Sequence, residues 1–155
     1  MEQYSTGAEG LDARIVRFIA RHHVMTIATF ADGMPYCANL FYAYIPEYNQ
    51  FVFTSDSKTR HYKEMVANPV VGASIVLETR NVGKIQGLQL QGYATLAEGE
   101  MLKIAKKAYL KRFPYALAAE LTLWIFHPRF MKLTDNRLGF GKKLIWRQEA
   151  NEIIL

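Results

Sequence analysis

The sequence predicts an α+β protein built on a closed or nearly closed antiparallel β-barrel, with short helices inserted between the strands. Three observations support this class. Strand-like segments dominate the chain, turns too short for a crossover separate several of them, and the helical segments fall between strands. The chain has 155 residues, which is the length of one domain, and half of them are apolar, which is enough to form a core. We therefore expect a single domain over residues 1–155.

The first element is an amphipathic helix predicted over residues 11–23. Ile15 and Phe18 lie at helical spacing on one side, and arginines occupy the other side. His22 and His23 end this segment. Polar or cationic side chains interact favourably with the C-terminal end of a helix dipole, so these histidines need no ligand.

Three strands in a meander are predicted from about residue 24 to residue 55. Asp32-Gly33 lies between the first two and is typical of a tight hairpin turn, because glycine tolerates the positive φ that such a turn requires. The sequence PEYN at residues 46–49 separates the second strand from the third. Short connections make these strands antiparallel neighbours.

The rest of the chain alternates between helices and strands. A helix is predicted over residues 56–68, where Asn68-Pro69 is a stop signal, and a surface helix follows at residues 100–112. The predicted strands of this half cover residues 70–77, 84–99, 122–127, 130–135 and 142–148.

Charge and cysteine content narrow the classes of ligand. The chain has 19 basic and 14 acidic side chains and a pI near 9.3, which favours anionic partners, including phosphorylated cofactors and nucleic acids. Cys37 is the single cysteine, so no intramolecular disulfide forms, and we expect it to be buried and unreactive. The histidines show no metal-ligand spacing, and we expect no metal site.

The localisation expected from the sequence is cytoplasmic. No apolar run reaches the roughly 20 residues that span a bilayer. The opening residues, MEQYSTGAEG, lack the basic start and apolar stretch of a signal peptide.

The segment 53–65 carries the residues best suited to bind a phosphate. A predicted strand ends there in hydroxyl side chains and passes into a helix start that bears cations, and free N–H groups at a helix start attract anions. An ordinary capped helix with solvated charges would show the same pattern. The side chains concerned are those of Thr54, Ser55, Ser57, Lys58, Thr59, Arg60 and His61.

The order of elements over residues 24–98 resembles the FMN-binding split barrels related to pyridoxamine 5′-phosphate oxidase. Phe53-Thr54-Ser55 is similar to the aromatic-Thr-polar triplet of that family, and Thr59-Arg60-His61 stands in its Ser-Arg-Lys position. Asn68-Pro69 closes the helix as in the family. Across nearly the whole chain, the segments CANLFY, SKTRH, KAYLKRFP and TDNRLGFGKKLIW resemble the uncharacterised YhbP-like bacterial group.

The resemblance implies one split-barrel domain that binds FMN and forms a homodimer with the flavin at the subunit interface. It assigns cofactor binding to Asn39, Leu40, Thr54, Ser55, Lys58, Thr59, Arg60, His61 and Gln86. An amide such as that of Gln86 can hydrogen-bond to the edge of an isoalloxazine ring. That Gln86 lies on a solvent-exposed strand face is an equal alternative. We expect Gln89 and Gln91 to be structural or to face solvent.

Two departures from the family pattern bear on function. Ala38 and Ala43 stand where the family has an arginine for the FMN phosphate and a lysine for the substrate phosphate, which argues against pyridoxamine phosphate as substrate. The segment 138–146 replaces the family's terminal Arg-Leu motif. Within this segment, Trp146 could contact a ligand or a second subunit. We expect it to have a structural role instead.

Two functions of different classes follow from the sequence. The first is an FMN-binding protein that acts as an oxidoreductase on an unidentified small molecule, with unknown catalytic residues, because the flavin carries the redox chemistry. The second is a non-enzymatic binding module, either a degenerate barrel with another ligand or a weak nucleic-acid binder. A cationic helix face is usually only solvated, so we do not expect nucleic-acid binding. That face carries Lys103, Lys106, Lys107, Lys111 and Arg112.

Overall fold

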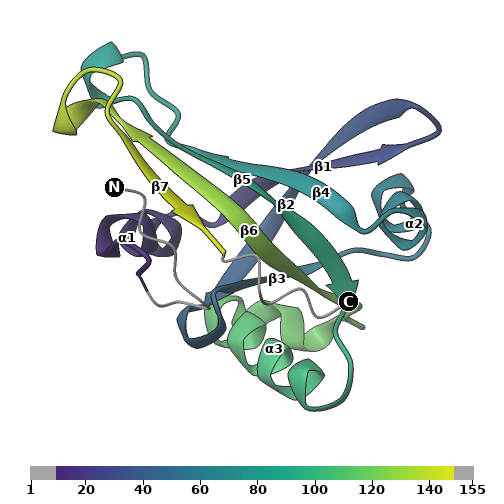
Figure 1. The fold of residues 1–155 in the computed structure, drawn as a ribbon. Coiled ribbons are helices and arrows are strands. Elements are labelled where there is room, and N and C mark those ends of the chain that lie inside the picture. The colour runs from purple at the N-terminus through teal and green to yellow at the C-terminus, as the bar shows by residue number, and fades with distance from the viewer. Residues whose placement is uncertain (1–9, 149–155) are drawn as a thin grey trace.

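The computed structural model describes residues 10–148, which form one antiparallel sheet with three α-helices (Figure 1). The strands follow one another in the sheet in the order β3-β2-β1-β4-β5-β6-β7. The strands are β1 (Val24–Ala31), β2 (Met34–Ile45), β3 (Gln50–Thr54), β4 (Val70–Val76), β5 (Gln86–Leu96), β6 (Leu123–Asp135) and β7 (Lys143–Arg147). The helices are α1 (Ala13–Arg21), α2 (Arg60–Ala67) and α3 (Gly99–Arg112).

A second pairing closes the sheet into a barrel. Strand β3 pairs with β6 as well as with β2, and Phe51 lies opposite Phe126 across this junction. Strand β7 pairs with β6 beyond the closed part. The α+β fold class with an antiparallel split barrel is therefore confirmed.

The β1–β2 hairpin has the turn that the sequence predicts. Ala31 pairs with Met34, so the loop consists of Asp32 and Gly33, and both have positive φ values, +52° and +74°. Two such residues form the turn whose twist matches that of the flanking strands. The hairpin extends beyond the barrel on the side of α2 (Figure 1).

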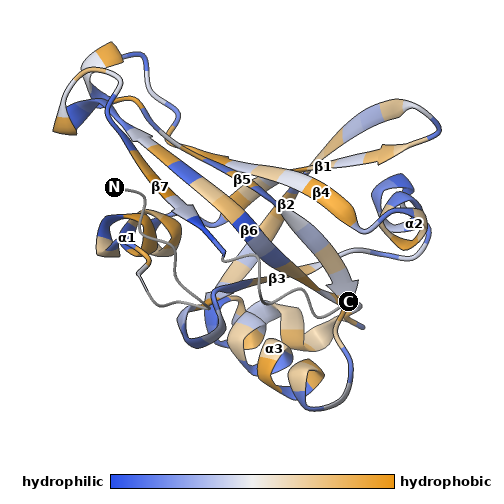
Figure 2. Ribbon diagram, in the orientation of Figure 1, coloured by the Kyte–Doolittle hydropathy of each residue, from blue (hydrophilic) through white to orange (hydrophobic). Residues whose placement is uncertain are grey.

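Several strands bury alternate residues in the barrel core, whereas β3 and the start of β6 are buried on both faces. Ile15, Phe18 and Ile19 of α1 join the barrel core, and Met65 of α2 joins it as well. Helix α3 covers part of the outer face, where Tyr109 packs in a second cluster with Val52 and Ile125. In Figure 2, α1 carries both hydrophobic and hydrophilic residues, and the start of β4 beside α2 is hydrophobic.

Three sequence-based expectations are wrong. Residues 122–127 and 130–135 belong to one strand, β6, which continues through Pro128 with an irregularity. Cys37 is exposed, because odd-numbered residues in this part of β2 point away from the core. Arg112 does not extend the cationic face of α3, since its guanidinium donates to the backbone carbonyls of Tyr42, Ala20 and His22.

Two other expectations agree with the structure. Trp146 is buried in the barrel core, which confirms its structural role, and Gln89 and Gln91 are exposed. The expected absence of a signal peptide concerns the first residues of the chain, and residues 1–9 lie outside those that the structure describes.

Candidate functional site

The start of α2 is held by hydroxyl groups that satisfy one another. Thr59 is the N-cap, and its Oγ1 accepts the N–H of Tyr62 at 3.3 Å and donates to the carbonyl of Asp56 at 2.8 Å. The hydroxyl of Ser55, which is buried, lies 3.2 Å from Thr59 Oγ1. Both residues therefore already serve the local structure as a helix cap.

Arg60 is engaged with neighbours on two sides. Its Nε donates to Glu64 Oε1 at 3.1 Å, and its guanidinium carbon lies 4.3 Å from the centre of the Tyr36 ring. The hydroxyl of Thr29 donates to the other carboxylate oxygen of Glu64. The Thr29 hydrogen bond and then the Arg60 contacts lower the pKa of Glu64, so this carboxylate is charged at neutral pH.

Sequence reasoning missed Glu64, although a signal for it exists. Arg60 and Glu64 are four residues apart on a helix, a spacing at which oppositely charged side chains meet. Because Glu64 neutralises part of the charge of Arg60, the start of α2 attracts a phosphate less strongly than the count of cations suggests.

A hollow of about 530 Å³ lies between α2 and the β1–β2 hairpin. Its lining includes three cations, Lys58, Arg60 and Lys63, and two carboxylates, Asp32 and Glu64. The hollow therefore carries a small excess of positive charge. Beside Thr59, at 3.4 Å, lies the ring of His61, and burial lowers the pKa of this imidazole.

The remaining residues of the predicted site lie in other places. Thr54 lies beside Tyr109 of α3. Asn39 is on the outer face of β2 and accepts from Thr26 at 2.7 Å, whereas Leu40 packs against the barrel core. Gln86 is buried at the other end of the sheet from α2, where it accepts from Arg21 at 3.3 Å. The structure thus brings residues 55–61 together but not Leu40 or Gln86.

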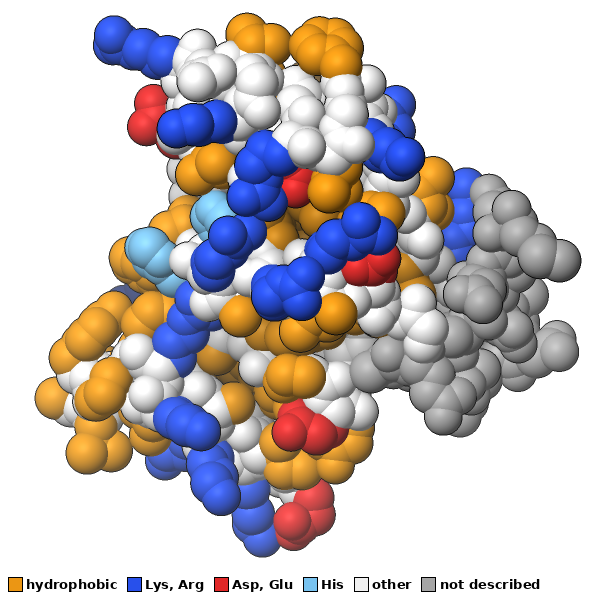
Figure 3. Space-filling view, turned by 90° about the vertical axis from the view of Figure 1, so that its left-hand side faces the viewer, with side chains coloured by type: hydrophobic (Ala, Val, Ile, Leu, Met, Phe, Trp, Pro, Cys, Tyr) orange, Lys and Arg blue, Asp and Glu red, His pale blue; other side chains and the backbone are white. Residues whose placement is uncertain are grey.

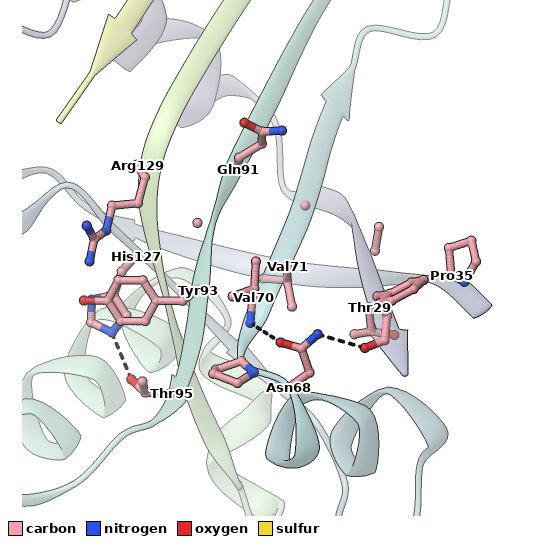
Figure 4. Close-up of a pocket in the computed structure, with 15 residues that line it drawn as sticks. Thr29, Pro35, Asn68, Val70, Val71, Gln91, Tyr93, Thr95, His127 and Arg129 are labelled. Atoms are coloured by element: carbon pink, nitrogen blue, oxygen red, sulfur yellow. Dashed lines mark hydrogen bonds between the residues drawn. The ribbon is translucent and has the colours of Figure 1, made fainter. Parts of the chain in front are cut away.

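A larger groove lies on the outer face of the sheet, where none of the described helices covers β1, β4 and β5. Its volume is about 1150 Å³, and most of its lining is apolar, including Phe30 and Val70. Figure 4 shows Arg129, His127 and Tyr93 on one side of the groove and Asn68 on the other. A concave apolar surface with a few polar groups is the usual form of a small-molecule site.

The polar side of the groove is a connected group of side chains. The rings of Tyr93 and His127 stack with centroids 4.5 Å apart and 10° between their planes. The two ring nitrogens of His127 lie 2.9 Å from the Thr95 hydroxyl and 3.2 Å from the Gln50 amide nitrogen. Burial, and then the charge of Arg129, lower the pKa of His127 to about 4, so its ring is neutral at pH 7.

Among the described residues, the groove and the hollow have no lining residue in common, because the groove is on the outer side of β1, whereas the Thr29 side chain is buried on the inner side. Thr29 lines the groove, and its hydroxyl donates to Glu64, which lines the hollow. Thr29 therefore connects the wall of the groove to the hollow through a buried hydrogen bond.

A third concavity, of about 490 Å³, lies between α1 and the end of β6. Figure 3, which views the side of the molecule that carries α1, shows many Lys and Arg side chains on this face. Of the four arginines that line the concavity, Arg14 pairs with Asp12 and Arg137 pairs with Asp135, both at 2.8 Å. These ion pairs offset half of the positive charge.

Two types of feature are not found within residues 10–148. None of the helices there is long and apolar enough to cross a membrane. No three His, Cys, Asp or Glu side chains of this part of the chain are grouped so that they could hold a metal ion.

The sequence is similar to proteins of one family. Residues 11–129 match the family described as pyridoxamine 5′-phosphate oxidase. A UPF0306 protein of Photorhabdus laumondii is 37% identical over 134 residues, which are 86% of this chain and 94% of the relative. The UPF0306 protein YhbP of Escherichia coli O157:H7 is 36% identical over 132 residues, or 85% of this chain and 90% of that protein.

Solved structures of similar fold include proteins with different cofactors in their names. A heme-binding protein from Mycobacterium smegmatis has a TM-score of 0.71 at 19% identity, over 84% of this chain and 55% of that chain. A FAD-binding protein from Mesorhizobium loti has a TM-score of 0.63 at 18% identity, over 79% of this chain and 92% of that chain. At such identities the comparison shows the fold alone.

Proposed function

The chain belongs to the pyridoxamine 5′-phosphate oxidase family, within its UPF0306 group, and we propose that it binds FMN and acts with it as an oxidoreductase on a small molecule. The observation that carries the proposal is the group of cations at the start of α2, and the apolar groove is the candidate site for the flavin ring. Flavin binding by a protein of similar fold, named for FAD, supports it.

The groove suits the ring system of a flavin. Its floor is the outer face of β1, β4 and β5, and Gly72 in the lining leaves the backbone open to a flat ligand. The volume, about 1150 Å³, exceeds the roughly 300–1,000 Å³ of most small-molecule sites, which leaves space for a second ligand beside the ring.

The phosphate would be held mainly by two side chains. The Lys58 side chain is exposed and no described residue pairs with it, so its ammonium is available as a point charge. Arg60 uses Nε for Glu64, but its side chain is 52% exposed and its terminal nitrogens can still donate to phosphate oxygens. The residues therefore fit a phosphate, with less positive charge than the family pattern provides.

These positions suggest a role for the flavin and for each group of residues. The flavin, when bound, supplies the redox chemistry. Lys58 and Arg60 would bind its phosphate, and the apolar strand residues would exclude water from one ring face. Gln91, which is exposed at the polar side of the groove, could hydrogen-bond to a ring edge.

We also propose that the protein is a homodimer in which a second copy covers this outer face. Phe30 and Val70 are exposed there, at 49% and 65%, although they are large and apolar. Such side chains on one uncovered face mark an interaction surface. A second copy on this face would close the groove into the interface site that the family resemblance implies.

A titration with two flavins tests the phosphate contacts. We expect Lys58→Ala and Arg60→Ala each to weaken FMN binding by roughly ten- to thirtyfold, because a hydrogen bond or ion pair to a charged group is worth about 1.5–2 kcal/mol. Riboflavin, which lacks the phosphate, should bind each variant as it binds the wild type. Lys103→Ala, on the exposed side of α3, is the matched control.

Three outcomes would count against the proposal. A colourless protein that does not quench the fluorescence of added FMN would favour the binding module. Equal losses for FMN and riboflavin would mean that Lys58 and Arg60 support the fold or the ring. Tight heme uptake, with a Soret band that His127→Gln alters, would assign the groove to heme instead.

A further inference from the structure

Arg129 occupies a position that a regular strand does not offer. Along the β5–β6 ladder, Gln91 lies opposite Phe130 and Gly92 lies opposite Pro128, so Arg129 is an extra residue of β6 in a β-bulge. Pro128 and Met131 are buried on either side. Arg129 and Phe130 therefore both face outward, and Arg129 lines the groove.

The neighbouring residues are suited to this bulge. A Cβ atom on Gly92 would lie 2.1 Å from the carbonyl oxygen of His127, so only glycine allows the two backbones to approach this closely. Pro128 has no N–H group and leaves no donor unpaired at the irregular position. The bulge is thus built into the sequence, and such features often re-aim a side chain at a functional site.

Arg129 has no anionic partner among the residues that the structure describes. None of the ion pairs there includes it, and its Nε is buried without a hydrogen-bond partner. It is also the one charged side chain in the described lining of the groove. A partly buried cation without a partner is costly, so the arrangement is explained best if a ligand supplies the missing acceptor.

The guanidinium is held in place by a stacked aromatic pair. Its carbon lies 5.0 Å from the centre of the Tyr93 ring, and Tyr93 stacks on His127. His127 is fixed in turn by Gln50 and Thr95. Figure 4 shows Arg129 beside this pair at the groove. A donor that is positioned before binding loses little entropy when the ligand arrives.

We propose that the groove binds an organic carboxylate with an apolar body, and that Arg129 recognises the carboxylate group. A planar guanidinium matches the two oxygens of a carboxylate. One cation balances a singly charged carboxylate better than a phosphate dianion, and the apolar lining, including Phe30 and Val70, suits the body of the ligand. Binding of the acid does not depend on the proposed function. Only its role as the substrate of a bound flavin rests on that proposal.

Isothermal titration calorimetry with a matched pair of probes tests the inference. The probes are 2-naphthoate and its neutral amide, 2-naphthamide, titrated into the flavin-free protein. We expect the wild type to bind the naphthoate at least about tenfold more tightly than the amide, and Arg129→Gln to abolish this preference while it retains amide binding. Arg129→Lys, which keeps the charge but loses the planar fork, should retain only part of the preference.

Arg147→Gln is the matched control, because Arg147 also stacks on an aromatic ring, that of Phe130 at 5.1 Å, but does not line the groove. We expect it to keep the preference for the naphthoate. Thermal melting of each variant shows whether it is folded. If Arg129→Gln unfolds, the comparison between Arg129→Lys and the wild type carries the test.

The inference is overturned if the folded Arg129→Gln variant prefers the naphthoate as strongly as the wild type, or if the wild type binds the naphthoate no better than the amide. Repeating the titrations after addition of FMN separates the two proposals. If FMN does not bind but the preference depends on Arg129, the anion site stands and the flavin proposal fails. If FMN binds and the preference is absent, this inference alone fails.

Discussion

His127 links the chemistry of the groove to the stability of the fold. The Gln50 amide donates to Nδ1, so the proton of the neutral ring lies on Nε2, from which it can be donated to Thr95. Burial and the nearby Arg129 lower the pKa of the ring to about 4, compared with about 6.5 in an unfolded chain. Protonation therefore favours the unfolded state.

The sign of this shift leads to a prediction about pH. Between pH 6.5 and pH 4 the unfolded chain binds more protons at His127 than the folded chain, so the free energy of unfolding should fall as the pH is lowered through this range. Because the ring is only partly buried, solvent screening reduces the effect, and we expect about 1–2 kcal/mol. Urea unfolding at several pH values measures it.

His127→Gln is the variant that identifies the source of this pH dependence. It removes the titrating group, so its unfolding free energy should change less between pH 6.5 and pH 4.5. Some pH dependence should remain in this variant, because burial also lowers the pKa of His61, and because Glu64 and Asp135, whose carboxyl pKa values are lowered, begin to add to it as the pH approaches their unfolded values. An unchanged pH dependence in His127→Gln would contradict the assignment.

Among the elements, β5 and β6 depend on one glycine. Gly92→Ala should destabilise the protein by about 2–4 kcal/mol, because the new Cβ atom would overlap the backbone of His127, and the strands would have to separate there. Chemical denaturation measures the change. Gly87→Ala, in the same strand, is the control, since its nearest atom would be 3.9 Å away. Equal effects for both variants would contradict this account.

The sequence predicts the elements better than it predicts their irregularities. The hairpin at Asp32-Gly33, the order of helices and strands and the end of α2 at Asn68 follow from local signals. The bulge at Arg129 does not, because the register depends on the partner strand β5. The sequence predicts two strands, at residues 122–127 and 130–135, whereas β6 is continuous and accommodates Pro128 where no ladder bond is needed.

The candidate site was predictable in part, for a related reason. Residues 55–61 are neighbours in sequence, and the structure keeps them together. Gln86 and Leu40 were assigned to the site by resemblance, but which face of a strand a residue occupies, and at which end of the barrel, depends on the whole sheet. Tyr93, His127 and Arg129 come from two strands and became visible as a group only in the structure.

At the scale of the whole molecule, the outer face of the sheet predicts the oligomeric state. We expect light scattering at micromolar concentration to give twice the mass of one 17.8 kDa chain. Val70→Glu, which places a charge on the 65% exposed groove residue, should give monomers. A dimeric Val70→Glu protein would show that another face forms the contact.

Val66→Glu provides the control for this experiment. Val66 is exposed to a similar extent, at 60%, but lies on α2 and does not line the groove. The variant should remain a dimer. Loss of the dimer in both variants would mean that added negative charge, rather than the outer face, determines association.

The junction between β3 and β6 also has a consequence for how the chain reaches its fold. Its hydrogen bonds join segments that are about 70 residues apart, so α2, β4, β5 and α3 all lie within the loop that must close. Contacts of such long range slow folding to the range of milliseconds to seconds. Until the barrel closes, β3 and β6 both present unpaired strand edges, and it is during this interval that a newly made chain is most exposed to aggregation.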